Sequence, residues 1–256
     1  MFKYTIVIAY DGTNYHGWQE QKDLMTVTQV LQDTFAYVFK KSIKILGASR
    51  TDAGVHAQGQ VAQFKTDLPL DTATMLRVWN AVLPGDIIIR SLDLSIADFH
   101  PLYNVVRKTY HYHVFLKKPS PFVQRYGWFY SSRVDIDKLT SALQIFVGTH
   151  DFTSFCSIDA PDPNKIRTID QISVEYVESW DAYRITVVAQ KFLRYMIRRM
   201  VGAALKVATT PDMPTHYIRD VLQAKNPINT LPTAAAKGLT LHSIEYAVPK
   251  IKGTHE

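Results

Sequence analysis

The residue types and spacing that most favour chemistry lie in residues 47–60, which read Gly-Ala-Ser-Arg-Thr-Asp-Ala-Gly-Val-His-Ala-Gln-Gly-Gln. Arg50 and Asp52 are two residues apart in this stretch, and Gly54 lets the backbone approach another segment closely. A carboxylate placed in this way can act as a nucleophile or as a general base. The alternative is an Asp side chain that hydrogen-bonds the backbone of its own turn, as in an Asx turn.

His111 and His113 form a second pattern that chemistry could use, because residues two apart on a predicted strand project from one face. No nearby carboxylate or cysteine pair completes a metal-ligand set around them, and ordinary core or surface histidines are the alternative. Cys156 is the only cysteine, which excludes an internal disulfide and a multi-cysteine metal site. The sequence also lacks phosphate-loop, dinucleotide-binding and nucleophile-elbow motifs. These residues therefore give no reason to expect a metal ion or a nucleotide cofactor.

The composition is that of a globular, weakly basic protein. The 256 residues include 29 Lys and Arg against 23 Asp and Glu, a formal charge of +6, and 46% are hydrophobic. That balance fits one large or two small domains with a buried core. No apolar run approaches the roughly 18 residues that cross a bilayer, and no cleavable leader is visible. We therefore expect an intracellular protein that makes no membrane contact.

The basic residues are unevenly distributed. Lys191, Arg194, Arg198 and Arg199 lie close together with no acidic residue among them, and aromatic residues stand beside several of them. Cationic groups bind phosphates and flat rings stack on unpaired bases, so the mixture suits RNA. A solvated charged face is the alternative interpretation of the same residues.

Hydrophobic periodicity predicts the elements that must position these residues. In the first half it predicts a strand over residues 2–10, a helix after a cap at Thr26, strands over 43–46 and 60–65, a helix over 71–83 and a strand over 87–92. In the second half it predicts a strand over residues 105–116, a helix capped by Asp135, strands over 169–177 and 183–189, a helix along 193–205, a short helix near 215–224 and a strand over 239–246. Each half follows the order β-α-β-β-α-β of ferredoxin-like domains. We therefore expect an α+β protein of two such halves related by pseudo-symmetry, residues 1–100 and 101–256, with a catalytic cleft where their sheets meet.

Six stretches, in order along nearly the whole chain, resemble motifs of the TruA-type tRNA pseudouridine synthases. The most specific is residues 49–57, Ser-Arg-Thr-Asp-Ala-Gly-Val-His-Ala, which is similar to the family's signature. The other five are residues 10–19, 107–112, 148–155, 192–202 and 233–239. The chain departs from the family's pattern at Ser49, where Gly is common, and at Arg199, where Asn is common.

The resemblance implies an isomerase that converts uridine to pseudouridine at positions 38–40 of the tRNA anticodon stem-loop, without a cofactor. It also implies a fold of two ferredoxin-like halves, a homodimer and a cytoplasmic location. Asp52 matches the family's catalytic carboxylate. That group attacks C1′ as a nucleophile, or removes the C2′ proton and leaves a glycal-like intermediate, and the sequence leaves both routes open.

Three further residues match substrate-binding positions of the family. Tyr110 is expected to stack on the uracil, whereas a core tyrosine is the alternative and is the default for Tyr112. Arg50 is expected to hold the extruded nucleotide or fill the space it leaves, and pairing with Asp52 or a neighbouring carboxylate is equally compatible. Arg198 is expected to pair with Asp52 and keep it ionised, with a phosphate contact or a solvated helix charge as the alternatives.

The neighbouring residues and the other protein classes complete the expectations. Residues 17–19 and the Tyr15 loop are candidates to reach RNA, with packing beneath the loop as the alternative for Trp18. His56 is expected to be structural or to order its loop. An RNA-binding module without activity is a second hypothesis, but the aromatic motif of RNA-recognition domains is missing. A glycosidase-like hydrolase is a third, and it would need a second carboxylate that the sequence does not single out.

Overall fold

The computed structural model describes residues 1–96, 98–228 and 230–247. Over these residues the chain is a mixed α+β structure, which confirms the fold class expected from the sequence. It divides into two compact units, Met1–Lys108 together with the segment that starts at Thr240, and Thr109–Leu239. The sequence places residues 101–256 in one half, of which residues 248–256 lie outside the described part. In the structure the last strand belongs to the first unit, because it pairs with a strand there.

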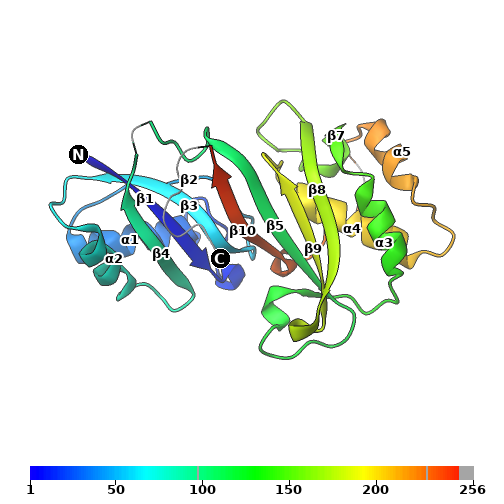
Figure 1. Ribbon diagram of the computed structural model, residues 1–256, viewed down its shortest axis with the longest axis horizontal. Helices are drawn as coiled ribbons and strands as arrows, with labels where there is room; N and C mark the ends of the chain where they lie inside the picture. Colours follow the sequence, from blue (N-terminus) through cyan, green and yellow to red (C-terminus); the bar gives the residue numbers. More distant parts are fainter. Residues whose placement is uncertain (97, 229, 248–256) are drawn as a thin grey trace. The chain divides into compact units, whose positions relative to one another are not determined.

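The first unit is built on a sheet with two helices. Its elements in chain order are β1 (Phe2–Tyr10), α1 (Val27–Phe39), β2 (Leu46–Gly47), β3 (His56–Thr66), α2 (Thr72–Asn80), β4 (Ile87–Leu94) and β10 (Leu239–Tyr246), shown in Figure 1. Strand β1 lies antiparallel between β4 and β3, and β2 pairs with the C-terminal half of β3. The first residues of β3 pair in parallel with β10, where His56 lies opposite Thr240.

Helix α1 begins where the sequence predicts because its cap is local. Thr26 Oγ1 accepts the Gln29 N–H at 3.3 Å, and Asp71 caps α2 in the same way. The expected strand over residues 43–46 is wrong except at its last residue. The Gln32 side chain of α1 accepts the Ile45 N–H at 3.1 Å, which takes that donor away from strand pairing.

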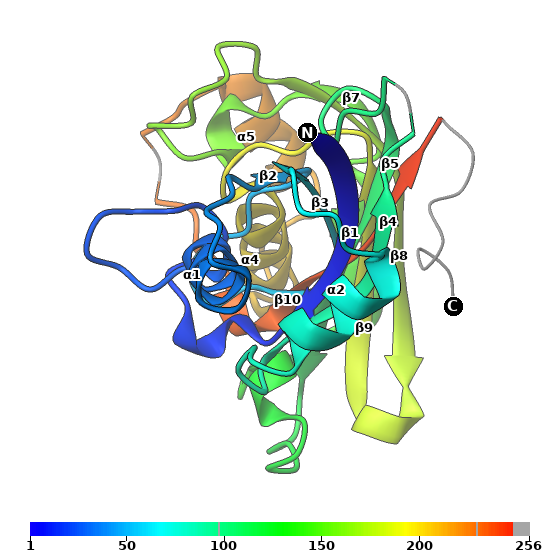
Figure 2. The same cartoon turned by 90° about the vertical axis from the view of Figure 1, so that its left-hand side faces the viewer.

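Aromatic side chains form the core between the helices and the sheet of the first unit. Phe35 of α1, Phe64 of β3 and Trp79 of α2 meet edge to face, with ring centroids 4.8–5.5 Å apart. The Trp79 indole N–H donates to Thr34 Oγ1 at 3.0 Å, so the buried ring keeps a partner for its donor. Both helices therefore pack on one face of the sheet (Figures 1 and 2).

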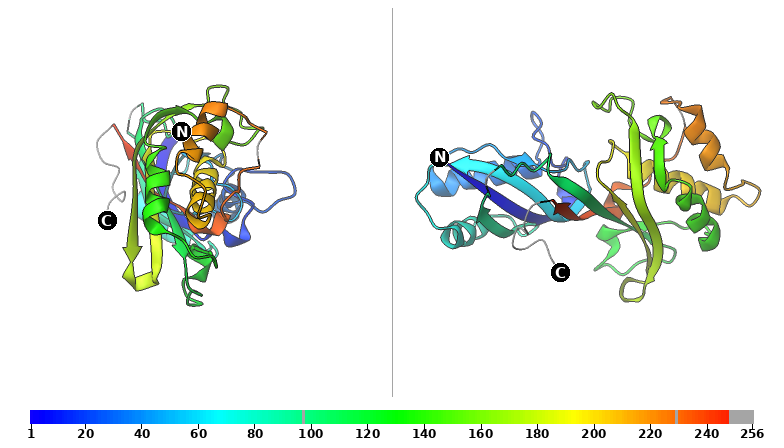
Figure 3. Two further views of the ribbon diagram at one scale, coloured as in Figure 1. Left: turned by 90° about the vertical axis from the view of Figure 1, so that its right-hand side faces the viewer. Right: turned by 45° about the horizontal axis from the view of Figure 1, so that its top comes forward.

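The second unit begins within β5 (Val105–Phe115), which enters it at Thr109. The elements that follow are β6 (Trp128–Phe129), α3 (Ile136–Gln144), β7 (Gly148–Asp151), β8 (Ile166–Val177), β9 (Ala182–Ala189), α4 (Met196–Thr209) and α5 (Tyr217–Ala224). Strand β8 lies between β9 and β7, and β9 is next to β5. Helices α3 and α4 lie on the same side of β8 and β9 (Figures 1 and 3), where Gln144 donates to the Ile172 carbonyl at 2.8 Å. Strand β7 was not predicted from the sequence, where Gly148 was interpreted only as the end of a helix.

Helix α4 carries the apolar stripe expected from the sequence. Six residues of this stripe are at most 4% exposed: Met196, Ile197, Met200, Val201, Ala204 and Leu205. Next to α4, the Asp135 N–H at the start of α3 donates to the Ala208 carbonyl at 3.2 Å. No helix in the described ranges is long and apolar enough to cross a membrane.

Candidate active site

Asp52 lies in the loop between β2 and β3, residues 48–55, which we call the Asp52 loop. Its side chain is partly exposed. The Val55 N–H donates to the Asp52 carbonyl at 3.1 Å and closes a turn. Gly54, the third residue of this turn, has a φ of 75°, in the left-handed region that favours glycine. The turn therefore explains the Asp-Ala-Gly sequence.

The N-terminal loop, residues 11–18, holds the backbone of the Asp52 loop. The Trp18 N–H donates to the Thr51 carbonyl at 3.1 Å, and the Gly54 N–H donates to the Tyr15 carbonyl at 3.2 Å. These two bonds lie on either side of Asp52. The main chain that carries the carboxylate is therefore held by backbone hydrogen bonds from the N-terminal loop.

Two glycines allow the close approach of these loops. A Cβ atom on Gly12 would lie 2.0 Å from the Val55 carbonyl oxygen. One on Gly17, whose φ is 88°, would lie 2.5 Å from the Thr51 carbonyl oxygen. Since both neighbours are backbone atoms, a side chain at either position would push the two loops apart.

Hydrogen bonds from distant side chains complete the support of the two loops. The Tyr10 hydroxyl shares a buried hydrogen bond of 2.8 Å with Thr51 Oγ1. The Tyr15 hydroxyl donates to Asp86 Oδ1 at 2.5 Å, and the Asp86 carbonyl accepts the Asp11 N–H at 2.9 Å. Burial and the Asp86 carboxylate raise the pKa of Tyr15 well above its usual value, so its hydroxyl stays a donor. Sequence reasoning missed Asp86, since no local pattern links it to residues about seventy positions earlier.

Trp18 is packed in the core, which agrees with the second of its two expected roles, packing beneath its own loop. It is 2% exposed, and its ring stacks on Tyr10 with centroids 6.0 Å apart. A Cβ atom on Gly47 would lie 2.3 Å from the Trp18 indole nitrogen, so the indole occupies the space next to β2. Trp18 therefore supports the loop from within the core.

His56 and Arg50 flank Asp52 in different environments. His56 is 2% exposed, and its Nδ1 accepts the Gly12 N–H at 3.0 Å. His56 Nδ1 also lies 3.1 Å from Asp11 Oδ1. Nδ1 must carry a proton to bind Asp11 and must lack one to accept the Gly12 N–H, so it binds only one of the two partners at a time. Both contacts tie His56 to the N-terminal loop, as expected of a loop-ordering residue. Arg50 is exposed.

Tyr110 and Tyr112 belong to β5 in the second unit, and both are buried. Tyr110 is 5% exposed, and its ring stands edge-on to Phe192 with centroids 5.1 Å apart. Tyr112 is fully buried, and its hydroxyl donates to the Ala235 carbonyl at 2.8 Å. Burial raises the pKa of Tyr112 well above its usual value. Tyr112 is therefore a core tyrosine, as expected.

Arg198 lies in the first turn of α4. Its Nε donates to the Ala234 carbonyl at 2.8 Å, and its own carbonyl accepts the Ala234 N–H at 3.0 Å. Its guanidinium also lies 5.1 Å from the centre of the Tyr195 ring. The side chain is therefore held in one direction by the segment that precedes β10. Of the four candidate residues, Arg50 and Asp52 share one loop of the first unit, and Tyr110 and Arg198 belong to the second.

Two other members of the basic cluster, Arg194 and Arg199, have partners within the protein. Arg194 pairs with Asp159 at 2.5 Å, and Arg199 donates to the Cys156 carbonyl at 2.6 Å. Both contacts hold the segment that follows the 153–155 turn. The unusual arginine at position 199 therefore has an internal partner, while Lys191 is exposed.

The two histidines of β5 differ in burial, His111 being half-buried and His113 buried. Their rings are 6.2 Å apart, and His113 is 6% exposed. Burial, followed by the charge of Arg184, lowers the pKa of His113 to about 4. No group of three or more His, Cys, Asp or Glu side chains in the described part of the chain could hold a metal ion.

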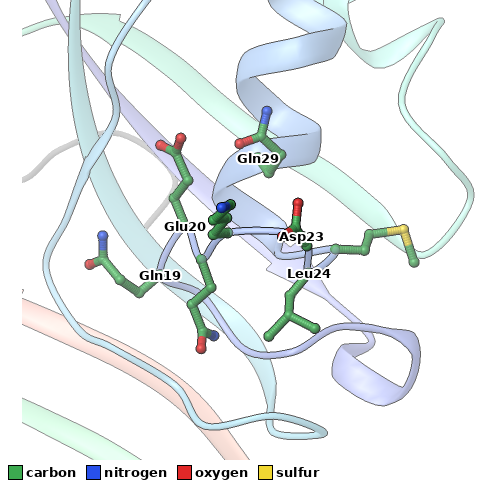
Figure 4. Close-up of a pocket in the computed structure, with 8 residues that line it drawn as sticks. Gln19, Glu20, Asp23, Leu24 and Gln29 are labelled. Atoms are coloured by element: carbon green, nitrogen blue, oxygen red, sulfur yellow. The ribbon is translucent and has the colours of Figure 1, made fainter.

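An open hollow lies next to the N-terminal loop and is drawn in Figure 4. Its lining consists of Gln19, Glu20, Gln21, Lys22, Asp23, Leu24, Met25 and Gln29. Glu20 accepts hydrogen bonds from Gln32 at 3.1 Å and from Lys44 at 3.3 Å. The hollow contains none of the candidate residues, and we assign it no part in the chemistry.

Comparison with known proteins gives consistent matches over nearly the whole chain. A family model described as tRNA pseudouridine synthase matches residues 6–104 and 142–247. The chain is 36% identical over 256 residues to "tRNA pseudouridine synthase A" of Thermodesulfovibrio yellowstonii, covering 96% of this chain and 100% of that protein. It is 34% identical to the protein of the same name from Pseudothermotoga lettingae, with 96% and 100% covered. The Limosilactobacillus reuteri protein of that name is 35% identical, with 96% and 97% covered.

Proposed function

This chain belongs to the tRNA pseudouridine synthase family, and from that premise we propose that Asp52 is the carboxylate with which it converts uridine to pseudouridine in the tRNA anticodon stem-loop. Family membership confirms the resemblance seen in the six motifs, and the activity of the family is the isomerisation of uridine to pseudouridine. The proposal adds the positions modified, 38–40, the catalytic residue and a reaction without a cofactor or metal.

The observation that carries the proposal is the way the main chain around Asp52 is held. The bond from Trp18 to Thr51 and the bond from Gly54 to Tyr15 bracket the residue on both sides. A carboxylate that reacts with a sugar carbon must be held within about 0.5 Å of its productive position. Such a carboxylate must also be accessible to the nucleotide. Asp52 is partly exposed, and its backbone is fixed by the two hydrogen bonds.

The chemistry exchanges one bond for another at C1′. The N1–C1′ bond breaks and its electrons leave with the uracil, which turns so that C5 faces the sugar. Either Asp52 has attacked C1′ and later leaves it, or Asp52 has removed the C2′ proton and later returns it. The C5–C1′ bond then forms, C5 loses its proton and N1 gains one. The carboxylate is regenerated in both routes, so no external reactant is consumed.

The other three residues serve the nucleotide. A uridine within a stem must be extruded, at a cost of a few kcal/mol, and stacking and phosphate contacts offset this cost. The proposal gives the Tyr110 ring, which stands edge-on to Phe192, the role of stacking on the uracil. Because Nε of Arg198 is bound to Ala234, a carboxylate or phosphate would meet its terminal nitrogens. Arg50 is exposed and can reach the extruded nucleotide or the space it leaves.

We also propose two ferredoxin-like halves. In the first unit the order β4-β1-β3-β2 is antiparallel throughout, with α1 and α2 on one face. In the second, β5, β9 and β8 lie in that order, with α3 after β5 and α4 after β9, which repeats the arrangement of β1, β3 and β2. The proposed cytoplasmic homodimer rests on the family resemblance. Light scattering that gives a mass near 29.2 kDa at assay concentration would contradict the dimer.

The decisive experiment uses unmodified tRNA transcripts. Purified protein is incubated with them, and pseudouridine is mapped by carbodiimide-dependent stops of reverse transcription. Asp52→Asn should form no pseudouridine and still bind tRNA, whereas the control Asp67→Asn, at an exposed ion pair with Lys41, should behave as wild type. Full turnover by Asp52→Asn would refute the assignment. Modification confined to positions outside 38–40 would refute the proposed specificity.

A further inference from the structure

Lys108, the last residue of the first of the two segments that make up the first unit, anchors the start of the Asp52 loop. Its Nζ donates to the Ala48 carbonyl at 2.7 Å and lies 3.3 Å from Ser49 Oγ. An ammonium group has three N–H donors, so one lysine can hold both oxygens. Because Lys108 is itself fixed in β5, this contact ties the loop to a regular strand.

The Gln60 side chain holds the backbone of Ser49, the residue whose hydroxyl is next to Lys108. Its Oε1 accepts the Ser49 N–H at 3.2 Å, and its Nε2 donates to the Ser49 carbonyl at 2.6 Å. Gln60 is fully buried in β3, so its amide is held firmly. Both backbone groups of Ser49 and its hydroxyl therefore have partners, three residues before Asp52.

We propose that Lys108 is a positioning residue for the isomerisation, which fixes the direction of the Asp52 loop through Ala48 and Ser49. The proposal rests on Asp52 being the catalytic carboxylate. Without the Lys108 contacts, the first residues of the loop keep the Gln60 amide and the bond from the Ala48 N–H to the Val61 carbonyl at 2.8 Å, but they lose their tie to β5. A displacement of about 1 Å at the reacting group can cost on the order of 100-fold in rate.

Ser49 and Lys108 act as a pair in this chain. Glycine, the common residue at position 49 in the family that the motifs resemble, has no hydroxyl. The serine found here offers Lys108 a second acceptor beside the Ala48 carbonyl. The departure at position 49 thus has a structural explanation, and it predicts that changes at the two positions are not additive.

The test compares Lys108→Met, Lys108→Arg, Ser49→Ala and the Lys108→Met/Ser49→Ala double variant in the full-length protein. The single-turnover rate is measured at saturating tRNA, and the tRNA Kd is measured over a range of salt concentrations. Lys108→Met should slow the reaction about 10- to 100-fold and change Kd less than about 2-fold, with the salt dependence unaltered. Lys108→Arg should recover part of the rate. Ser49→Ala should cost about 2- to 10-fold alone and nothing further in the double variant.

Several results would overturn the proposal. A wild-type rate in Lys108→Met refutes it. A weaker Kd with a salt slope reduced by about 1 and an unchanged rate would make Lys108 a phosphate contact instead. If Lys108→Met does not fold, Ser49→Ala decides, and a wild-type rate for this variant refutes the proposal. Asp52→Asn is assayed in parallel: if it turns over, the proposed function fails, and if it is inactive while Lys108→Met is not, only the positioning role fails.

Discussion

Replacing Gly17 by alanine tests how closely the reaction depends on the contact between the N-terminal loop and the Asp52 loop. The added Cβ would lie 2.5 Å from the Thr51 carbonyl oxygen, against the 3.4 Å at which ordinary contact begins, a shortfall of 0.9 Å. Neither loop can move easily, because the atom contacted is the Thr51 backbone carbonyl oxygen and the Trp18 N–H is bonded to that same oxygen. The two loops must therefore separate by most of this distance.

The cost of Gly17→Ala has two parts. The φ of 88° strains an alanine by about 1–2 kcal/mol, and the close contact adds about 1–3 kcal/mol. For a chain of this size each kcal/mol lowers Tm by about 2–4 °C, so the total of about 2–5 kcal/mol should lower Tm by roughly 4–20 °C. The displacement next to Asp52 should also slow single-turnover pseudouridine formation on the order of 100-fold.

The matched control is Gly85→Ala. Nothing lies within 4 Å of a Cβ at Gly85, so this change should leave both Tm and rate close to wild type. Tm is followed by circular dichroism, and the rate is measured on folded protein at a temperature well below both transitions. A Gly17→Ala protein with wild-type rate and Tm would refute the idea that the two backbones are tightly packed. A lower Tm with an unchanged rate would show that the contact stabilises the fold without placing Asp52.

Two other outcomes are expected. Arg198→Gln should lower the single-turnover rate about 10- to 100-fold and affect tRNA affinity less, because it removes a charged donor; weaker affinity at an unchanged rate would identify a phosphate contact. The depressed pKa of His113, about 4 against 6.5, means that the unfolded chain binds more protons between these values. The free energy of unfolding should therefore fall by about 3 kcal/mol as the pH drops from 6.5 to 4, and His113→Phe should remove this part of the pH dependence in urea titrations; equal slopes for both proteins would contradict it.

Features with local causes were predictable from the sequence. The caps at Thr26 and Asp71 depend on residues three positions away, and both helices begin where expected. The strand expected over residues 43–46 failed because a side chain from α1, Gln32, takes the Ile45 N–H. No periodicity of residues 43–46 contains that information.

In the candidate site, too, the local features were predictable from the sequence and the contacts with distant residues were not. The Asp-Ala-Gly turn is local, and its residue types made Asp52 a candidate, which the family resemblance then identified as the catalytic carboxylate. Its supports come from far along the chain, such as Tyr10 bonded to Thr51 and Lys108 bonded to Ala48, and no spacing in the sequence announces them. The roles of Asp52 and of its three partners stay predictions until they are tested.

The pairing of His56 with Thr240 has a consequence for biosynthesis. The β3 edge next to the Asp52 loop receives its neighbour β10 only after the ribosome has added Thr240, which follows His56 by 184 residues. Until then a nascent chain presents an open strand edge, a place where proteins are prone to associate wrongly. The strand that follows the Asp52 loop therefore completes its pairing late, although the loop is encoded in the first quarter of the sequence.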